Sequence, residues 1–135
     1  MAKVINVNHV AIAVPDIDNA LRFWEDALGL ELDHIEEVST QKSKVAFITV
    51  GASEVELIEP ETLDSGLAKF ISDKGPGMHH LCLEVDDLDG MIVDLKDKGI
   101  RLINEIPDEL PGRKIVFIHP KASGGVLIEL FQVIP

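Results

Sequence analysis

The chain is poor in cysteine. Its 135 residues contain one, Cys82, which lies in an apolar segment. A single cysteine excludes an intramolecular disulfide and a thiolate metal cluster. We expect Cys82 to be a small buried apolar side chain. A chain of this length corresponds to one ordinary domain, so we predict a single domain over residues 1–135.

Long apolar runs and basic residues are also scarce. No apolar run approaches the roughly 20 residues of a membrane span, and no signal-like block follows Met1. We therefore expect a cytoplasmic protein with no membrane partner. Lys and Arg number 12 against 24 Asp and Glu, a formal charge of −12. Nucleic-acid binding needs clustered Lys and Arg, so this charge argues against such a partner.

The first part of the chain follows a strand, helix and three-strand pattern. Residues 8–14 alternate between two faces, which predicts a strand. Apolar residues then recur at helical spacing over 17–28, with Asp16 as the predicted N-cap and Gly29 as the end. Three apolar stretches follow, at 30–38, 44–50 and 54–58, and predict three strands. This segment is a βαβββ module.

The same pattern returns after a connector. Residues 60–77 are rich in Gly and Pro and contain a short predicted helix. Aligning His80 with His9 then places one strand-and-helix pattern over the other, and the second predicted helix stops at Gly99. We predict an α+β chain of two modules, at about 5–59 and 78–135. Each module is too small to bury its sheet alone, so the two should pack side by side or across a homodimer interface.

The repeat singles out two histidines and two glutamates. His80, not His79, aligns with His9, and strand alternation puts His80 on the more polar face. Glu56 and Glu129 align in the closing strands, where a carboxylate is costly unless it is paired. Each residue alone has an ordinary structural explanation. Because both copies carry the same pair, we predict that His9, Glu56, His80 and Glu129 bind one metal ion.

This ligand set indicates the kind of ion. Two imidazoles and two carboxylates suit one borderline divalent cation, and they leave two octahedral positions for substrate or water. We expect Co²⁺ first, with Zn²⁺, Mn²⁺ or Ni²⁺ as alternatives, and no other cofactor.

Several motifs resemble the vicinal oxygen chelate superfamily and, within it, the methylmalonyl-CoA epimerase family. The segments that carry the resemblance are Asn8–Asp16, Gly77–His80, His119–Lys121 and Gly125–Leu130. The resemblance covers essentially the whole chain. It implies a glyoxalase-like fold with a curved mixed sheet around a metal site, the same four ligands, and an epimerase that acts on an acyl-CoA thioester.

The resemblance also bears on the proton transfers. Epimerisation removes an α-proton and returns one on the opposite face, and metal-bound Glu129 is our candidate base. At least one type in this family has a second catalytic glutamate where this chain has Val45. The second proton-transfer group is therefore unassigned. For the phosphates of the acyl carrier, Lys121 and Arg113 are the candidate contacts.

Other functions share this pattern. A glyoxalase I-like isomerase would use the same four ligand types and pass through an enediolate. A non-catalytic small-molecule binding protein of the same fold would usually lack a complete ligand set. A ring-cleaving dioxygenase fits less well, because such sites use two histidines and one carboxylate.

Overall fold

The computed structural model describes residues 2–135 and divides into two compact units. We call residues 9–79 the His9 unit. Residues 80–135, together with the segment up to Asn8, form the His80 unit. Met1, the first residue of the predicted domain, lies outside the described residues.

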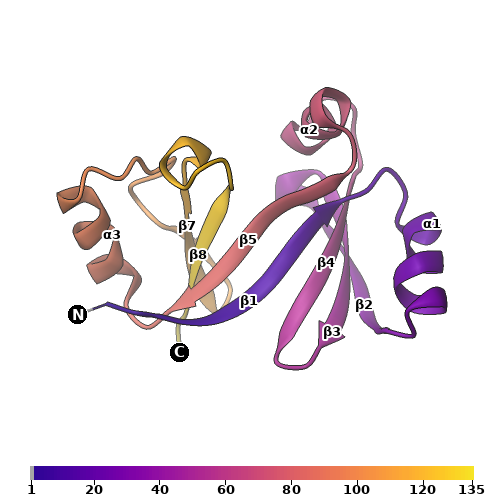
Figure 1. Ribbon diagram of the computed structural model, residues 1–135, viewed down its shortest axis with the longest axis horizontal. Helices are drawn as coiled ribbons and strands as arrows, with labels where there is room; N and C mark the ends of the chain where they lie inside the picture. The colour runs from indigo at the N-terminus through magenta and orange to yellow at the C-terminus, as the bar shows by residue number, and fades with distance from the viewer. Residues whose placement is uncertain (1) are drawn as a thin grey trace. The chain divides into compact units, whose positions relative to one another are not determined.

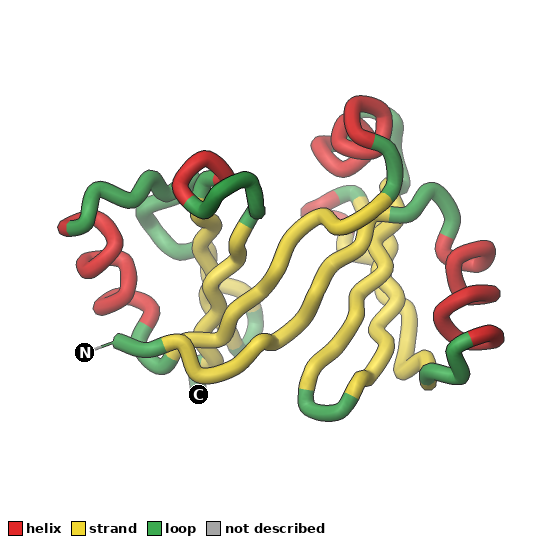
Figure 2. Tube along the Cα trace, in the orientation of Figure 1, coloured by secondary structure: helices red, strands yellow, loops and turns green. Residues whose placement is uncertain are grey.

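The His9 unit is a four-stranded mixed sheet with helices. Its strands run in the order β2-β3-β4-β1, with β1 parallel to β4 and antiparallel pairing elsewhere. In Figure 1, α1 lies alongside these strands and α2 lies near one end of them, and Figure 2 shows the short loop between β3 and β4. The elements are β1 (Val4–Ala13), α1 (Ile17–Leu21), the π-helical turn η1 (Arg22–Ala27), β2 (Glu31–Val38), the 3₁₀ turn η2 (Ser39–Gln41), β3 (Ser43–Val50), β4 (Ser53–Pro60) and α2 (Gly66–Lys74).

The His80 unit repeats this arrangement. Its strands run in the order β5-β8-β7-β6, again with the first and last strands of the module parallel. In Figure 1, α3 lies alongside β7 and β8. The elements are β5 (Gly77–Val85), α3 (Leu88–Asp97), β6 (Asp108–Leu110), β7 (Arg113–Ile118), the 3₁₀ turn η3 (Pro120–Ala122) and β8 (Ile128–Val133). The prediction of an α+β chain with two βαβββ modules is confirmed.

Each unit buries one sheet face under its helix. In the His9 unit, Ile17 of α1 packs against Ala46, Ile48 and Leu57 of the sheet. The His80 unit has the matching cluster, in which helix residues meet β5, β7 and β8: Val85, Leu88, Ile92, Val116 and Leu130. Because side chains alternate along a strand, the intervening residues project from the opposite face, which carries the predicted metal ligands.

The start of each module helix is held in the same way. Asp16 and Asp87 are the N-caps, each accepting a hydrogen bond from a first-turn N–H. A side chain on the closing strand accepts from the first helical N–H: Glu59 from Ile17 and Gln132 from Leu88, both at 2.7 Å. These bonds satisfy N–H groups that have no partner inside a helix.

The helix ends also follow the predicted pattern. Gly29 and Gly99 have φ of 75° and 73°, the left-handed conformation that glycine adopts without a steric penalty. The predicted Asp16 cap and both glycine stops are confirmed. The first helix differs in one respect, because its second half winds as the π-helical η1 rather than as an α-helix.

Candidate metal centre

His9 and Glu56 form one pair on the sheet face opposite α1. They lie on the parallel neighbours β1 and β4, where Ala11 is the register partner of Glu56. The His9 Nδ1 and Glu56 Oε2 atoms are 3.1 Å apart, and the side chains are only 9% and 14% exposed. The topology of the module places this pair, since the first and last strands of βαβββ become neighbours.

His80 and Glu129 form the corresponding pair in the His80 unit. They lie on the parallel neighbours β5 and β8. The His80 Nε2 and Glu129 Oε1 atoms are also 3.1 Å apart, with side chains 11% and 9% exposed. Cys82 is the register partner of Glu129 and is fully buried, as its apolar context predicted.

The spacing within each pair suits two neighbouring ligands of one cation. Imidazole nitrogen and carboxylate oxygen bind divalent ions such as Zn²⁺ at about 2.1 Å. Two adjacent ligands of an octahedron with bonds of about 2.1 Å are about 3.0 Å apart. The observed 3.1 Å in both pairs matches this separation. It is also a hydrogen-bond length, so the same geometry satisfies the buried groups without an ion.

A phenylalanine neighbours each glutamate. Phe47 on β3 is the register partner of Glu56, and Phe117 on β7 is the register partner of Glu129. The Phe117 ring lies edge-on to His80, with 5.9 Å between ring centroids. Sequence reasoning missed both residues, although each lies in the strand before its glutamate. Their rings give each carboxylate an apolar neighbour, which strengthens its attraction to a cation.

The adjacent histidines have different surroundings. The His79 ring lies edge-on to Phe70 of α2 at 4.8 Å, within the His9 unit. His80 instead contacts a carboxylate and Phe117. This contrast supports a structural role for His79 and a ligand role for His80, which stays a prediction.

Val45 is a buried core residue of the His9 unit. It is 4% exposed and clusters with Ala11, Ala13 and Ile58, against which α2 residues pack. Its position on β3 therefore offers no carboxylate and no room for one without repacking.

The candidate phosphate contacts lie at opposite ends of β7. Arg113 opens the strand, whereas Lys121 lies in η3, just beyond its other end. Since β7 spans six residues, these ends are roughly 20 Å apart. Lys114 is engaged elsewhere, because its Nζ lies 3.0 Å from an Asp89 carboxylate oxygen.

Lys121 belongs to a small basic group that the sequence did not reveal. The His119 N–H donates to the Arg101 carbonyl at 3.0 Å, and the His119 Nδ1 accepts from the Lys121 N–H at 3.1 Å. Partial burial and the nearby Arg101 and Lys121 cations hold the pKa of His119 below its ordinary value. The charges of Arg101 and Lys121 both act on His119, so the two cations lie in its neighbourhood.

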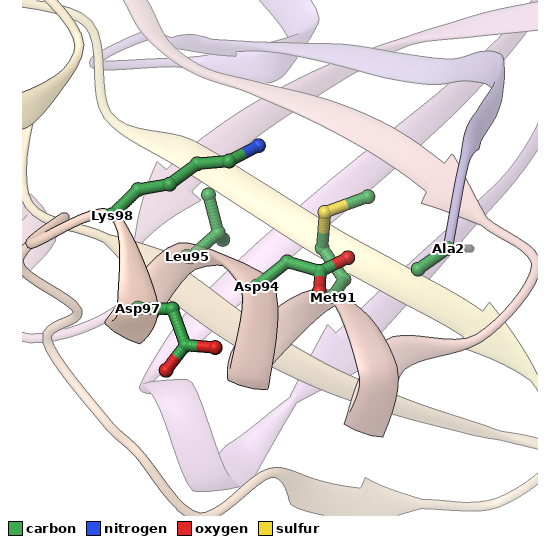
Figure 3. A pocket seen from close by; sticks show the side chains of 6 residues that line it. All are labelled: Ala2, Met91, Asp94, Leu95, Asp97 and Lys98. Carbon is green, nitrogen blue, oxygen red and sulfur yellow. The ribbon is translucent and has the colours of Figure 1, made fainter.

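A hollow of about 320 Å³ lies beside α3, and Figure 3 shows the side chains that line it. Helix residues including Met91 and Asp94 line it together with Ala2 and Lys98. It lies on the helix side of the His80 unit, whereas His80 and Glu129 project from the other sheet face. None of the predicted site residues lines it.

The chain resembles known proteins along nearly its whole length. Residues 8–117 match the sequence profile of the Glyoxalase/Bleomycin resistance protein/Dioxygenase superfamily. The chain is 41% identical over 128 residues to mitochondrial methylmalonyl-CoA epimerase of Homo sapiens, covering 93% of this chain and 73% of the human protein. No helix among residues 2–135 is long and apolar enough to span a membrane.

Solved structures agree with this likeness. The crystal structure of methylmalonyl-CoA epimerase from Mycobacterium tuberculosis matches with a TM-score of 0.88 and 39% identity, covering 98% of this chain and 90% of that one. A methylmalonyl-CoA epimerase in complex with methylmalonyl-CoA and NH4+ matches with a TM-score of 0.87 and 32% identity, covering 97% of this chain and 96% of that one. The chain therefore belongs to the methylmalonyl-CoA epimerase family, within the Glyoxalase/Bleomycin resistance protein/Dioxygenase superfamily.

Proposed function

We propose that this chain is a metal-dependent methylmalonyl-CoA epimerase that interconverts the (2R) and (2S) thioesters. The observation that carries the proposal is the duplicated histidine–carboxylate pair, spaced at 3.1 Å in both units of a chain from this family. A binding protein of the same fold would usually lack a complete ligand set, so two complete pairs favour the enzyme.

In this proposal His9, Glu56, His80 and Glu129 together hold one divalent cation. Their two nitrogens and two oxygens suit Co²⁺, Zn²⁺, Mn²⁺ or Ni²⁺, with Co²⁺ as our first choice. When bound, the cation supplies a Lewis acid for the thioester and carboxylate oxygens of the substrate. The low exposure of both pairs supports such a role, because charge interactions are stronger away from water.

Glu129 removes the C2 proton in this proposal. Its carboxylate is 9% exposed and lies between Cys82 and Phe117 in register, so few water molecules compete for it. Contact with His80 fixes the direction of the carboxylate. A general base must be held within hydrogen-bond reach of the proton that it removes, and these contacts restrict Glu129 to one orientation.

Lys121 and Arg101 are our proposed contacts for the phosphates of coenzyme A. The charges of both residues lower the pKa of His119, which supports a common basic neighbourhood for them. Arg113 lies at the other end of β7 and would contact a different part of the carrier. In a chain of charge −12, a local basic group is what allows a polyanion to approach.

We further propose that residues 1–135 act as one domain within a cytoplasmic homodimer. Each module is too small to bury a sheet well alone, which favours tight association of modules within or between chains. Sedimentation equilibrium of the metal-loaded protein would measure the mass directly, and a monomer at micromolar concentration would contradict the dimer.

Solvent deuterium exchange tests the function. The purified chain, loaded separately with Co²⁺, Mn²⁺, Zn²⁺ or Ni²⁺, should exchange the C2 hydrogen of methylmalonyl-CoA in D₂O, as followed by proton NMR. The chelated protein and the Glu129→Gln variant are the matched controls and should not exchange. If no ion supports exchange while a glutathione hemithioacetal is isomerised, the chain is a glyoxalase I-like enzyme instead.

A further inference from the structure

The Glu56 side chain reaches diagonally across the sheet of the His9 unit. Its Oε2 atom lies 3.1 Å from His9 Nδ1. In the strand register, however, His9 stands opposite Glu54, one row away from Glu56 on the same face. A glutamate side chain has several rotamers, so its surroundings must favour the one that points toward His9.

The two neighbours of Glu56 in its own row differ in size. On β1 the register partner is Ala11, whose small side chain takes up little space on the side of His9. On β3 the register partner is Phe47. Directly opposed residues of an antiparallel pair have Cβ atoms about 5 Å apart, so a phenyl group stands beside the β3 side of the glutamate. Rotamers that turn the carboxylate away from His9 meet this ring.

The Phe47 ring is supported from its other side. The His34 ring on β2 stacks on it, with 4.5 Å between ring centroids and 12° between ring planes. One row across β2, β3 and β4 therefore reads His34, Phe47, Glu56. Because Phe47 is the middle residue of this row, the side of its ring away from His34 is turned toward β4.

Two carboxylates in turn hold the His34 ring. Its Nδ1 lies 2.7 Å from Asp33 Oδ2, and its Nε2 lies 3.0 Å from Glu36 Oε1. Both ring nitrogens are thus occupied, which fixes the plane of the imidazole. These hydrogen bonds, to Asp33 and then Glu36, raise the pKa of His34 above its ordinary value. The two carboxylates also balance the charge of the imidazolium, so it does not draw Glu56 away from His9.

We propose that the stacked rings of His34 and Phe47 form a clamp that holds the Glu56 carboxylate toward His9. This inference rests on the proposed function, in which Glu56 is a metal ligand. A ligand that is already held in its binding orientation loses less conformational entropy when the cation binds, so the clamp raises metal affinity. His34 and Phe47 are therefore positioning residues, and the whole clamp lies within the His9 unit.

NMR of the metal-free chain tests the clamp directly. Three-bond couplings of the Glu56 side chain should report one rotamer in the wild-type chain and averaged rotamers in Phe47→Leu, which removes the ring but stays apolar. Val45→Ala is the matched control, because Val45 lies on the same strand and face as Phe47 but stands opposite Ile58. This control should lower stability and leave the Glu56 couplings unchanged. Averaged couplings in the wild-type chain, or wild-type couplings in Phe47→Leu, would overturn the inference.

Calorimetric titration with Co²⁺ measures the consequence of the clamp. Phe47→Leu should raise the Kd about tenfold, the lower end of the range for residues that support a metal ligand. His34→Gln removes only the outer ring and should raise the Kd about threefold. His34→Phe keeps a stacked ring without the hydrogen bonds and should restore the wild-type Kd, and Val45→Ala should not change it.

The outcomes separate the clamp from the proposed function. Equal weakening of Co²⁺ binding in His34→Phe and His34→Gln would overturn the inference, because the stacked ring would then make no difference. A Phe47→Leu variant with the Kd of Val45→Ala would overturn it too. Failure of the wild-type chain to bind any divalent cation would reject the proposed function, whereas the couplings of Glu56 decide the clamp without a metal.

Discussion

The inner strands of the two units carry corresponding residues, whereas their outer strands differ. Both have a histidine–glutamate pair at 3.1 Å, a phenylalanine opposite the glutamate, and a side chain on the last strand that binds the helix start. In the His9 unit the outer strand β2 has eight residues, whereas β6 of the His80 unit has three. The two units therefore share the histidine–glutamate pairs and the anchoring of the helix starts, and they differ at the outer edge of the sheet.

The shorter strand leaves no counterpart of His34 and Glu36. β6 pairs only with Arg113–Ile115 and does not reach Phe117. At that level the Ile103 N–H donates to the Phe117 carbonyl at 2.8 Å, and the Asn104 side chain accepts from the Phe117 N–H at 2.9 Å. A loop thus satisfies the backbone of β7. Both units have the histidine–glutamate pair, while their outer strands differ in length.

Replacing either glutamate of the two pairs with glutamine should give the largest effect on kcat, and the two variants should differ in how much activity they lose. Glu129→Gln removes a proposed base as well as a ligand, so kcat should fall roughly 10⁴-fold. Glu56→Gln keeps an oxygen ligand and removes no base, so the loss should be about tenfold. Steady-state kinetics of epimerisation measure the loss of kcat in both variants, and metal analysis shows whether each variant still binds the ion. Equal losses would show that Glu129 is only a ligand.

The adjacent histidines test which strand face holds the cation. His80→Ala should weaken metal binding at least about 100-fold, because it removes one of four ligands. His79→Ala should keep the metal and lower the free energy of unfolding by about 1 kcal/mol through loss of its contact with Phe70. Calorimetric metal titration and urea unfolding give the two quantities. Metal loss in His79→Ala would mean that the strand is assigned the wrong face.

The basic group of the His80 unit should affect binding rather than chemistry. Lys121→Ala and Arg101→Ala should each raise KM for the acyl-CoA about fivefold, or about 1 kcal/mol, and the effect should shrink with added salt. A substrate cut to the pantetheine thioester should show no change. Lys114→Ala is the control, because that lysine is paired with Asp89. An unchanged KM in both test variants would contradict the phosphate contact.

The duplicated helix-start bonds give a smaller, matched pair of effects. Glu59→Ala and Gln132→Ala each remove the acceptor of a 2.7 Å bond from a helical N–H, at Ile17 and Leu88. Each should lower the free energy of unfolding by about 1 kcal/mol. Urea unfolding measures this, and an effect in one unit alone would show that the two helix starts are not equivalent.

The titration of His34 should give the smallest effect on stability. Since its pKa is raised in the folded chain, its ion pairs stabilise the fold fully below its unfolded pKa, and this contribution is lost as pH rises through the folded pKa. The group is exposed, so the change is small. In Glu36→Gln the pKa should fall, as measured by NMR of the ring protons. An unchanged pKa would show that Asp33 alone controls it.

The sequence by itself determined the elements, the repeat and the identity of the paired residues. Alternation predicts the strand faces, and helical spacing and caps predict α1 and α3. The alignment of His80 with His9 favours His80 over His79 as the ligand. These signals are local or lie at a constant distance along the chain, so one sequence is enough to read them.

The tertiary structure decided which residues stand opposite one another. Strand register brought Phe47 beside Glu56, Phe117 beside Glu129 and Glu36 opposite Val45. Register depends on backbone hydrogen bonds between distant segments, and single residues such as His34 carry no repeat that would reveal their place.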